Sequence, residues 1–244
     1  DAGLEEEWFE KNSDDSWVKI STSKAWTSQE QGREYHGVAW YHTAFELPAT
    51  AGQYEKLMLH FGAVDYESEV FVDGEPAGRH FGGAVSFSID ITDRVEVGRS
   101  HELVLRVFDD TRSQVQPAGK QSIIYRSRGC RYTRVTGIWQ TVWLEPIDPR
   151  GLRDIHLVPD LDAGRIQIYP RLFSNRRADS LRAALLADGK VVAEAESSAS
   201  PGTALSLDIP GGGRPWSIDD PFLYDLEITV LGRDGDPLDA VKSY

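Results

Sequence analysis

The stretch Tyr132 to Pro146, Y-T-R-V-T-G-I-W-Q-T-V-W-L-E-P, decides the fold of this chain. After Gly137, two sets of side chains alternate: Ile138, Gln140, Val142 and Leu144 against Trp139, Thr141 and Trp143. A period of two, rich in β-branched and aromatic residues, predicts one β-strand with two different faces. The face with two Trp residues should be covered, and Pro146, which has no backbone N–H, should end the strand.

Upstream of this stretch, the same alternation recurs at short and regular intervals. Further strands are predicted over 36–47, 57–61, 69–72, 85–91 and 103–107. Asp73-Gly74 suits the positive φ angles of a type I′ hairpin turn. Residues 1–35 are irregular, with isolated Trp and Phe anchors, and no segment before Pro146 predicts a helix convincingly. At least six short strands without helices are typical of a sandwich or jelly roll.

A break between two domains is predicted at residues 146–151, P-I-D-P-R-G, because two Pro and a Gly interrupt any β-ladder there. Beyond it, about seven strands are expected in 147–244. Leu181 to Glu194 is rich in Ala and Leu, but Asp188-Gly189 in its middle favours a hairpin over a helix. The predicted organisation is all-β: a jelly-roll β-sandwich over 1–146, followed by an immunoglobulin-like β-sandwich over 147–244.

Composition and charge exclude several classes of function. The 244 residues carry a formal net charge of −13, which disfavours nucleic acid as a partner. Arg126 to Arg134 holds four Arg in nine residues and is interpreted as a solvated loop. No apolar run approaches the roughly 20 residues that cross a bilayer, so no membrane partner is predicted, and the compartment stays open. Cys130, the only cysteine, can form no disulfide within the chain.

No catalytic or cofactor motif is present. The Gly-rich stretches lack nucleotide-binding spacing, the six His lack metal-ligand spacing, and no G-x-S-x-G occurs, so no cofactor and no metal are predicted. Neighbouring carboxylates are interpreted as solvated loops or turn caps, because adjacent strand residues point to opposite faces. These are Glu5-Glu6-Glu7, Asp14-Asp15, Asp109-Asp110 and Asp219-Asp220. No catalytic residue is predicted in this chain.

Several segments together carry a resemblance to a known family. They are H-G-V-A-W-Y-H-T-A-F-E-L-P (36–48), L-H-F-G-A-V-D-Y-E-S-E-V-F-V-D-G (59–74), F-S-I-D-I-T (87–92), A-G-K-Q (118–121), the opening stretch, and W-S-I-D-D-P-F-L-Y-D-L (216–226). In order and spacing they are similar to the N-terminal region of family 2 glycoside hydrolases, the β-galactosidase and β-glucuronidase group. The resemblance implies that the two catalytic carboxylates lie on a (β/α)₈ barrel beyond this chain.

The resemblance also implies where the first domain contributes to a sugar subsite. Its acidic or amide position in F-G-A-V-D-Y corresponds to Asp65, with Tyr66 beside it. An Asp in a loop can equally satisfy backbone N–H groups. Just upstream of T-G-I-W, where family members carry an Asp, this chain has Arg131 and Tyr132 nearby. That departure questions recognition of galactose-type hydroxyls, because Arg suits an anionic sugar or a loop ion pair.

Three hypotheses follow. The chain is the non-catalytic N-terminal portion of a family 2 glycosidase, a free-standing carbohydrate-binding module, or a structural β-sandwich pair without ligand. The first predicts a carbohydrate substrate bound through the full-length enzyme, the catalytic barrel as partner, and a homo-oligomer as a further possibility. It also predicts an exposed apolar patch where the barrel would lie. Sugar titration separates the second hypothesis from the others.

Overall fold

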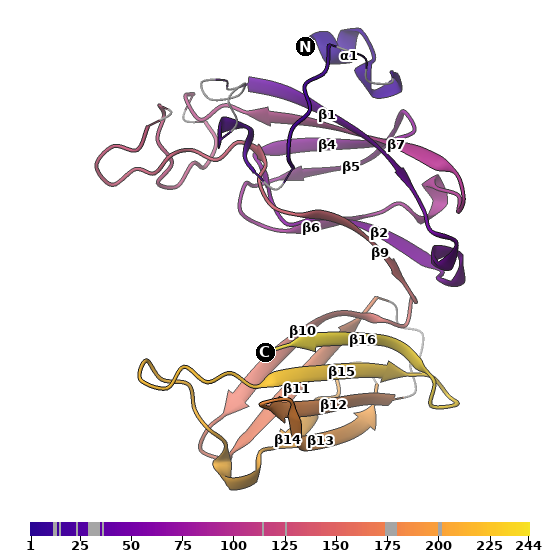
Figure 1. Cartoon of the computed structure of the whole chain (residues 1–244), viewed down its shortest axis with the longest axis vertical. Helices are drawn as coiled ribbons and strands as arrows, with labels where there is room; N and C mark the ends of the chain where they lie inside the picture. Colours follow the sequence, from indigo (N-terminus) through magenta and orange to yellow (C-terminus); the bar gives the residue numbers. More distant parts are fainter. Residues whose placement is uncertain are drawn as a thin grey trace. The chain divides into compact units, whose positions relative to one another are not determined.

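The computed structural model describes residues 1–11, 14, 16–22, 24–28, 35, 37–113, 115–124, 126–173, 180–199 and 202–244 (Figure 1). His36, at the predicted start of the first strand, and Asp15, in one predicted carboxylate pair, lie outside these residues. The chain divides into two compact units, Asp1–Pro146 and Ile147–Tyr244. Both are built from antiparallel strands, so the predicted all-β fold class is confirmed.

The first unit pairs a four-stranded sheet with a three-stranded one. The larger sheet has the order β1-β7-β4-β5, the smaller β6-β2-β9, and β3 pairs separately with β8. The strands are β1 (Gly37–Glu46), β2 (Lys56–Phe61), β3 (Val64–Asp65), β4 (Glu67–Val72), β5 (Glu75–Phe81), β6 (Phe87–Asp90), β7 (Ser100–Asp109), β8 (Gly137–Ile138) and β9 (Val142–Ile147).

Alternating apolar residues of both sheets form the core of this unit. In β2 every second residue is buried, which places Leu57, Leu59 and Phe61 in the interior as predicted. Phe61 stacks on Phe87 of β6, with 4.7 Å between ring centroids. The hairpin between β4 and β5 has positive φ at both Asp73 and Gly74, which confirms the predicted turn.

Short helical turns flank these strands. They are α1 (Ala2–Glu5) and the 3₁₀ turns η1 (Trp8–Glu10), η2 (Trp26–Ser28), η4 (Ala49–Gln53) and η5 (Thr92–Arg94). Across the described residues, no helix has both the length and the apolar character needed to span a bilayer.

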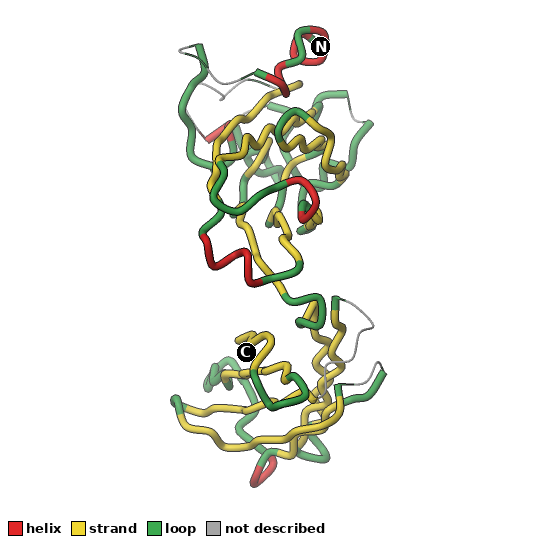
Figure 2. The backbone as a smooth tube through the Cα atoms, turned by 90° about the vertical axis from the view of Figure 1, so that its right-hand side faces the viewer, coloured by secondary structure: helices red, strands yellow, loops and turns green. Residues whose placement is uncertain are grey.

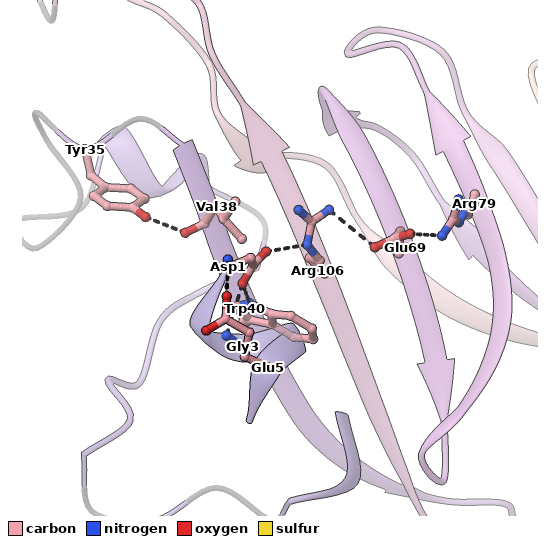
Figure 3. Close-up of polar contacts among 9 residues, drawn as sticks. All are labelled: Asp1, Gly3, Glu5, Tyr35, Val38, Trp40, Glu69, Arg79 and Arg106. Atoms are coloured by element: carbon pink, nitrogen blue, oxygen red, sulfur yellow. Dashed lines mark hydrogen bonds and ion pairs between the residues drawn. The ribbon is translucent and has the colours of Figure 1, made fainter. Parts of the chain in front are cut away.

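A chain of charges fixes the N-terminal turn to the larger sheet (Figure 3). Arg106 on β7 donates from Nε to Asp1 Oδ2 at 2.7 Å and from Nη1 to Glu69 Oε2 at 3.3 Å. Arg79 pairs with the other oxygen of Glu69. Asp1 also accepts from the backbone N–H of Gly3 at 3.0 Å. The three central side chains are largely buried, so α1 covers that face of the sheet through a satisfied ionic network.

The stretch 132–146 departs from the single strand predicted for it. It forms two separate strands, β8 and β9, and residues 139–141 between them follow no strand. Pro146 lies inside β9, because β9 is an edge strand whose missing N–H needs no partner. The face with two Trp residues is not fully covered either. Trp143 is 43 % exposed and stacks on His60, with 4.9 Å between ring centroids.

The second unit contains seven strands in the part of the chain that the structure describes. One sheet has the order β10-β11-β14 and the other β13-β12-β15-β16 (Figure 2). The strands are β10 (Leu152–Asp160), β11 (Arg165–Leu172), β12 (Ser180–Ala187), β13 (Lys190–Ser198), β14 (Leu205–Asp208), β15 (Asp225–Leu231) and β16 (Pro237–Ser243); the turn η6 (Pro210–Gly212) follows β14.

The hairpin between β12 and β13 confirms the preference for strands over a helix in this unit. Asp188 and Gly189 both have positive φ, as a type I′ turn requires. The Ala and Leu residues of β12 fill the core instead of a helical stripe, and Leu181, Ala183 and Leu185 are all buried. Local turn chemistry therefore overrode the helix propensity of Ala and Leu.

Candidate functional site

A short antiparallel ladder brings two of the family-like segments together in the first unit. Strand β3 ends at Asp65, and its partner β8 begins at Gly137, directly opposite. Gly137 has φ +74°, and a Cβ there would collide with the Tyr41 hydroxyl, so only Gly fits. The Tyr41 hydroxyl accepts from the backbone N–H of Ile138 at 3.2 Å, and burial raises the pKa of Tyr41. The segments F-G-A-V-D-Y and T-G-I-W thus share one ladder.

Asp65 lies in the interior, only 2 % exposed. Gln121 donates from Nε2 to Asp65 Oδ2 at 2.7 Å. The backbone of Gly83 lies so close to this carboxylate that any Cβ at Gly83 would overlap it. Burial raises the pKa of Asp65 to about 6, and the hydrogen bond from Gln121 opposes that rise. Asp65 is therefore enclosed by an amide and a glycine.

Gln121 links this carboxylate to the loop that follows β7. Its Oε1 accepts from the backbone N–H of Val135 at 2.7 Å, while its own backbone forms a bridge to Tyr132. Its carbonyl accepts from Arg131 Nη1 at 3.2 Å. Gln121 stood in the family-like segment A-G-K-Q, yet no site role was predicted for it. Its place in that segment is the signal that could have found it.

A second buried carboxylate, Asp109, lies at the end of β7 and is fully buried. Gln116 donates from Nε2 to Asp109 Oδ1 at 2.6 Å, and its Oε1 accepts from the backbone N–H of Asp110 at 3.0 Å. Burial raises the pKa of Asp109 to about 7; the charge of Asp65 adds to the rise, and Arg134 opposes it. Sequence interpretation placed the pair Asp109-Asp110 in a solvated loop or a turn cap, which is wrong for Asp109. Asp110 does cap the turn.

The basic stretch 126–134 divides into exposed and buried members. Arg126, Arg128 and Arg131 are exposed, whereas Arg134 is 1 % exposed and donates from Nη2 to the Tyr35 carbonyl at 3.1 Å. The solvated loop predicted for the whole stretch is therefore wrong for Arg134. This guanidinium enters the interior because the Asp109 carboxylate lies there, and two opposite buried charges tolerate burial better than one.

The four predicted site residues occupy different environments. Asp65 is buried, Tyr66 is half-buried, and Arg131 and Tyr132 are exposed. Arg131 and Arg128 exchange backbone hydrogen bonds of 3.0 Å, which form a tight hairpin tip. Tyr132, 65 % exposed, is held by its backbone N–H, which donates to the Lys120 carbonyl at 2.8 Å. Gln121 connects Asp65 and Arg131, whereas the carbonyl of Tyr66 accepts from the backbone N–H of Gly82 at 3.1 Å.

The loop has an unusual charge. From Thr111 to Leu144 the chain has six basic and no acidic residues, so all 39 acidic residues lie outside this segment. Five of the six are exposed: Arg112, Lys120, Arg126, Arg128 and Arg131. In Figure 1 the loop, drawn in pink, extends beyond the sheets of the first unit. Exposed cations beside an exposed Tyr ring can bind an anionic, ring-shaped ligand.

No other described part of the chain offers a comparable constellation. Among the described residues, no group of three or more His, Cys, Asp or Glu side chains is placed to hold a metal ion. Surface depressions occur beside Asp160 and Gln167 in the second unit and beside Phe9 and Gly74 in the first. Neither depression is lined by a predicted site residue.

The fold and this loop define a class: paired antiparallel sandwiches, the first of which presents a basic loop braced by buried carboxylates. Comparison with known proteins shows what the chain is similar to. The sequence model for "Glycosyl hydrolases family 2" matches residues 151–244. A β-glucuronidase of Bacteroides fragilis is 28 % identical over 219 residues, covering 84 % of this chain. A β-galactosidase of Thermoanaerobacter pseudethanolicus is 28 % identical over 127 residues, covering 52 % of this chain.

A solved structure supports the same fold. The β-glucuronidase from Ruminococcus gnavus in complex with uronic deoxynojirimycin superposes with a TM-score of 0.76 over 99 % of this chain, at 20 % identity. The second unit therefore matches the model of the glycosyl hydrolases of family 2, and the whole chain resembles the N-terminal β-sandwich region of such enzymes. It spans 30 % of the B. fragilis relative, 16 % of the T. pseudethanolicus relative and 41 % of the R. gnavus chain.

Proposed function

We propose that this chain is the non-catalytic N-terminal portion of a glycosidase that hydrolyses O-glycosidic bonds, with β-glucuronidase-like or β-galactosidase-like specificity. In this proposal the chain supports a (β/α)₈ barrel and lends its basic loop to the sugar subsite. The observation that carries it is the loop itself: five exposed cations in a segment without acids, in a family whose named relatives act on glucuronides and galactosides.

The two coupled carboxylates argue for a supporting role. Retaining hydrolysis requires two carboxyl groups about 5 Å apart that both contact the sugar. Asp65 and Asp109 have raised pKa values, as catalytic acids often do. Yet both are closed to solvent, and Gln121 and Gln116 occupy one oxygen of each. Their function in this proposal is to hold the base of the loop, while the barrel supplies the catalytic pair.

Arg131 favours an anionic sugar over a neutral one. Its side chain is exposed at the hairpin tip, and within the described residues one of its N–H groups is used, on the Gln121 carbonyl. The remaining donors can form a paired contact with a carboxylate, which a galactose hydroxyl cannot reproduce. We therefore propose a uronic acid glycoside as the substrate class.

The experiment compares the 244-residue chain with the full-length natural protein on an aryl β-glucuronide and an aryl β-galactoside. We expect no turnover by the chain alone and turnover of the glucuronide by the full-length protein. Arg131→Ala in the full-length protein should lower kcat/KM for the glucuronide about tenfold to a hundredfold, the equivalent of one charge-assisted contact. Arg94→Ala, an exposed cation outside this loop, serves as the matched control.

Two results would overturn the proposal. One is hydrolysis of either glycoside by the 244-residue chain alone. The other is a full-length protein without glycosidase activity. An equal loss for Arg131→Ala on both substrates would refute the uronic acid assignment while leaving the supporting role intact.

A further inference from the structure

One loop of the second unit exposes three large apolar side chains. Between β14 and β15, Trp216 is 58 % exposed, Ile218 88 % and Leu223 56 %. We call these three residues the apolar loop patch. Single exposed apolar residues are common on protein surfaces, but three within eight residues concentrate apolar surface on one loop, as interaction sites do.

The loop that carries the patch is held in one conformation by its own polar groups. Arg214 donates from Nε to Asp220 Oδ2 at 2.6 Å and pairs through Nη2 with the other oxygen of that carboxylate. The guanidinium carbon also lies 4.3 Å from the ring centroid of Phe222. The backbone N–H of Arg214 donates to the Tyr224 hydroxyl at 2.7 Å.

None of these contacts involves the apolar loop patch. The charged and half-buried side chains fix the loop from within, and the three apolar side chains remain on the outside. A surface that is ordered before it is covered loses less conformational entropy when a partner binds. The loop is therefore organised as a preformed contact surface.

The end of the chain lies beside this loop. Strands β15 and β16 are antiparallel, and Leu226 at the start of β15 pairs with Ser243 at the end of β16. The loop enters β15 at Asp225, so the backbone beyond Ser243 leaves the sheet at the end of the strands where this loop enters it. Figure 1 shows the C-terminus at the end of the second unit from which the long loop before β15 extends.

We propose that the apolar loop patch is the docking surface for the polypeptide that continues from Tyr244 in the full-length protein. This inference rests on the proposed function. The lengths of the relatives favour this occupant, because this chain spans only 30 % of the B. fragilis relative and 41 % of the R. gnavus chain. A downstream domain would start next to the patch, so a short connection is enough to bring an apolar surface onto it.

Hydroxyl-radical footprinting with mass spectrometry tests this occupant. Oxidation rates are measured in the 244-residue chain and in the full-length protein. Trp216 and Ile218 should react about fivefold more slowly in the full-length protein, as expected for side chains at the core of an interface. Tyr54 and Val97, which are exposed to 43 % and 44 % in the first unit, serve as controls and should react equally in both proteins.

Equal oxidation rates of Trp216 in the two proteins would overturn the proposal. Protection that already occurs in the 244-residue chain and rises with its concentration would also overturn it, because a second copy would then be the occupant.

A pair of variants gives an independent measurement. Ile218→Ser should leave the Tm of the 244-residue chain unchanged, since the side chain is exposed there, but should speed proteolysis of the full-length protein. Val97→Ser, an exposed aliphatic residue elsewhere, should do neither. Glycosidase activity is recorded separately: a full-length protein that protects Trp216 but hydrolyses no glycoside refutes the proposed function alone. One that hydrolyses glycosides without protecting Trp216 refutes the docking surface alone.

Discussion

Replacement of Asp65 by Asn should stabilise the first unit, and only at neutral or alkaline pH. The substitution preserves the shape of the side chain and a carbonyl oxygen that can accept from Gln121 Nε2. It removes a negative charge that burial makes costly, since Asp65 is 2 % exposed and its hydrogen-bond donor is the neutral amide of Gln121.

The magnitude follows from the pKa values. Burial raises the pKa of Asp65 from 3.8 to about 6 in the folded protein, while the unfolded chain keeps the ordinary value. Between these two pH values the folded protein binds a proton that the unfolded chain has lost, so the stability of the wild type falls as the pH rises through this window. The full difference corresponds to about 3 kcal/mol above pH 7. Below pH 4 the carboxyl is protonated in the folded protein, and the effect of the substitution vanishes.

Urea unfolding at pH 8 and at pH 4, followed by tryptophan fluorescence, measures this effect. Six of the seven tryptophans lie in the first unit, so the signal reports mainly on that unit. We expect Asp65→Asn to raise the free energy of unfolding by up to about 3 kcal/mol at pH 8, and by much less at pH 4. Glu46→Gln, which removes an exposed charge in the same unit, is the control.

The reasoning is refuted if Asp65→Asn and the wild type show the same dependence of stability on pH. It is also refuted if the substitution destabilises the unit equally at both pH values, because Asp65 would then act through shape and hydrogen bonding alone. Loss of the Asp65 charge should in addition lower the pKa of Asp109, which that charge helps to raise.

Three further substitutions test the structure around this site and the N-terminal network. Gly83→Ala places a methyl group against the Asp65 carboxylate and should cost about 2 kcal/mol by urea unfolding; an unchanged midpoint would contradict the close approach. Trp139→Phe removes the indole N–H that donates to the Gly83 carbonyl at 2.7 Å and should cost about 1 kcal/mol. Arg106→Leu leaves Glu69 with one fewer cation in a largely buried network and should lower the free energy of unfolding by about 2 kcal/mol. This loss should fade when urea unfolding is repeated at pH 3, where carboxylates become protonated.

Strands and turns could be predicted from the sequence because their signals are local. The alternation of Leu57, Leu59 and Phe61 requires only a sheet with one buried face, and the structure buries all three. Asp188-Gly189 similarly outweighed the helix propensity of its neighbours, because positive φ at two successive residues closes a hairpin.

The same inference from local alternation was wrong for the stretch 132–146. Alternation continues through residues 139–141, but Thr141 and Trp139 hydrogen-bond to Gly62 and Ala63, outside any regular ladder. Which residues pair across a sheet is decided by distant segments, so periodicity within one segment cannot reveal such an interruption. The exposure of Trp143 has the same cause, since its partner is the single ring of His60.

The polar interior was the least predictable part of the candidate site. Asp109 and Arg134 are separated by more than twenty residues of loop, and nothing in either segment alone indicates burial. The segment without acidic residues between them was visible in the sequence. It was interpreted as a solvated loop, and the sequence does not show which of its cations turns inward.

The segregation of charge in the first unit affects how the protein meets charged molecules in solution. A protein with a net charge of −13 and an isoelectric point near 4.9 is repelled, on average, by anything negative. A positive loop on an acidic protein creates an electric dipole, so an approaching anion is steered toward the basic loop. Because charges farther apart than about 10 Å are screened at 0.1 M salt, this orientation is a property of dilute buffers and fades as ionic strength rises.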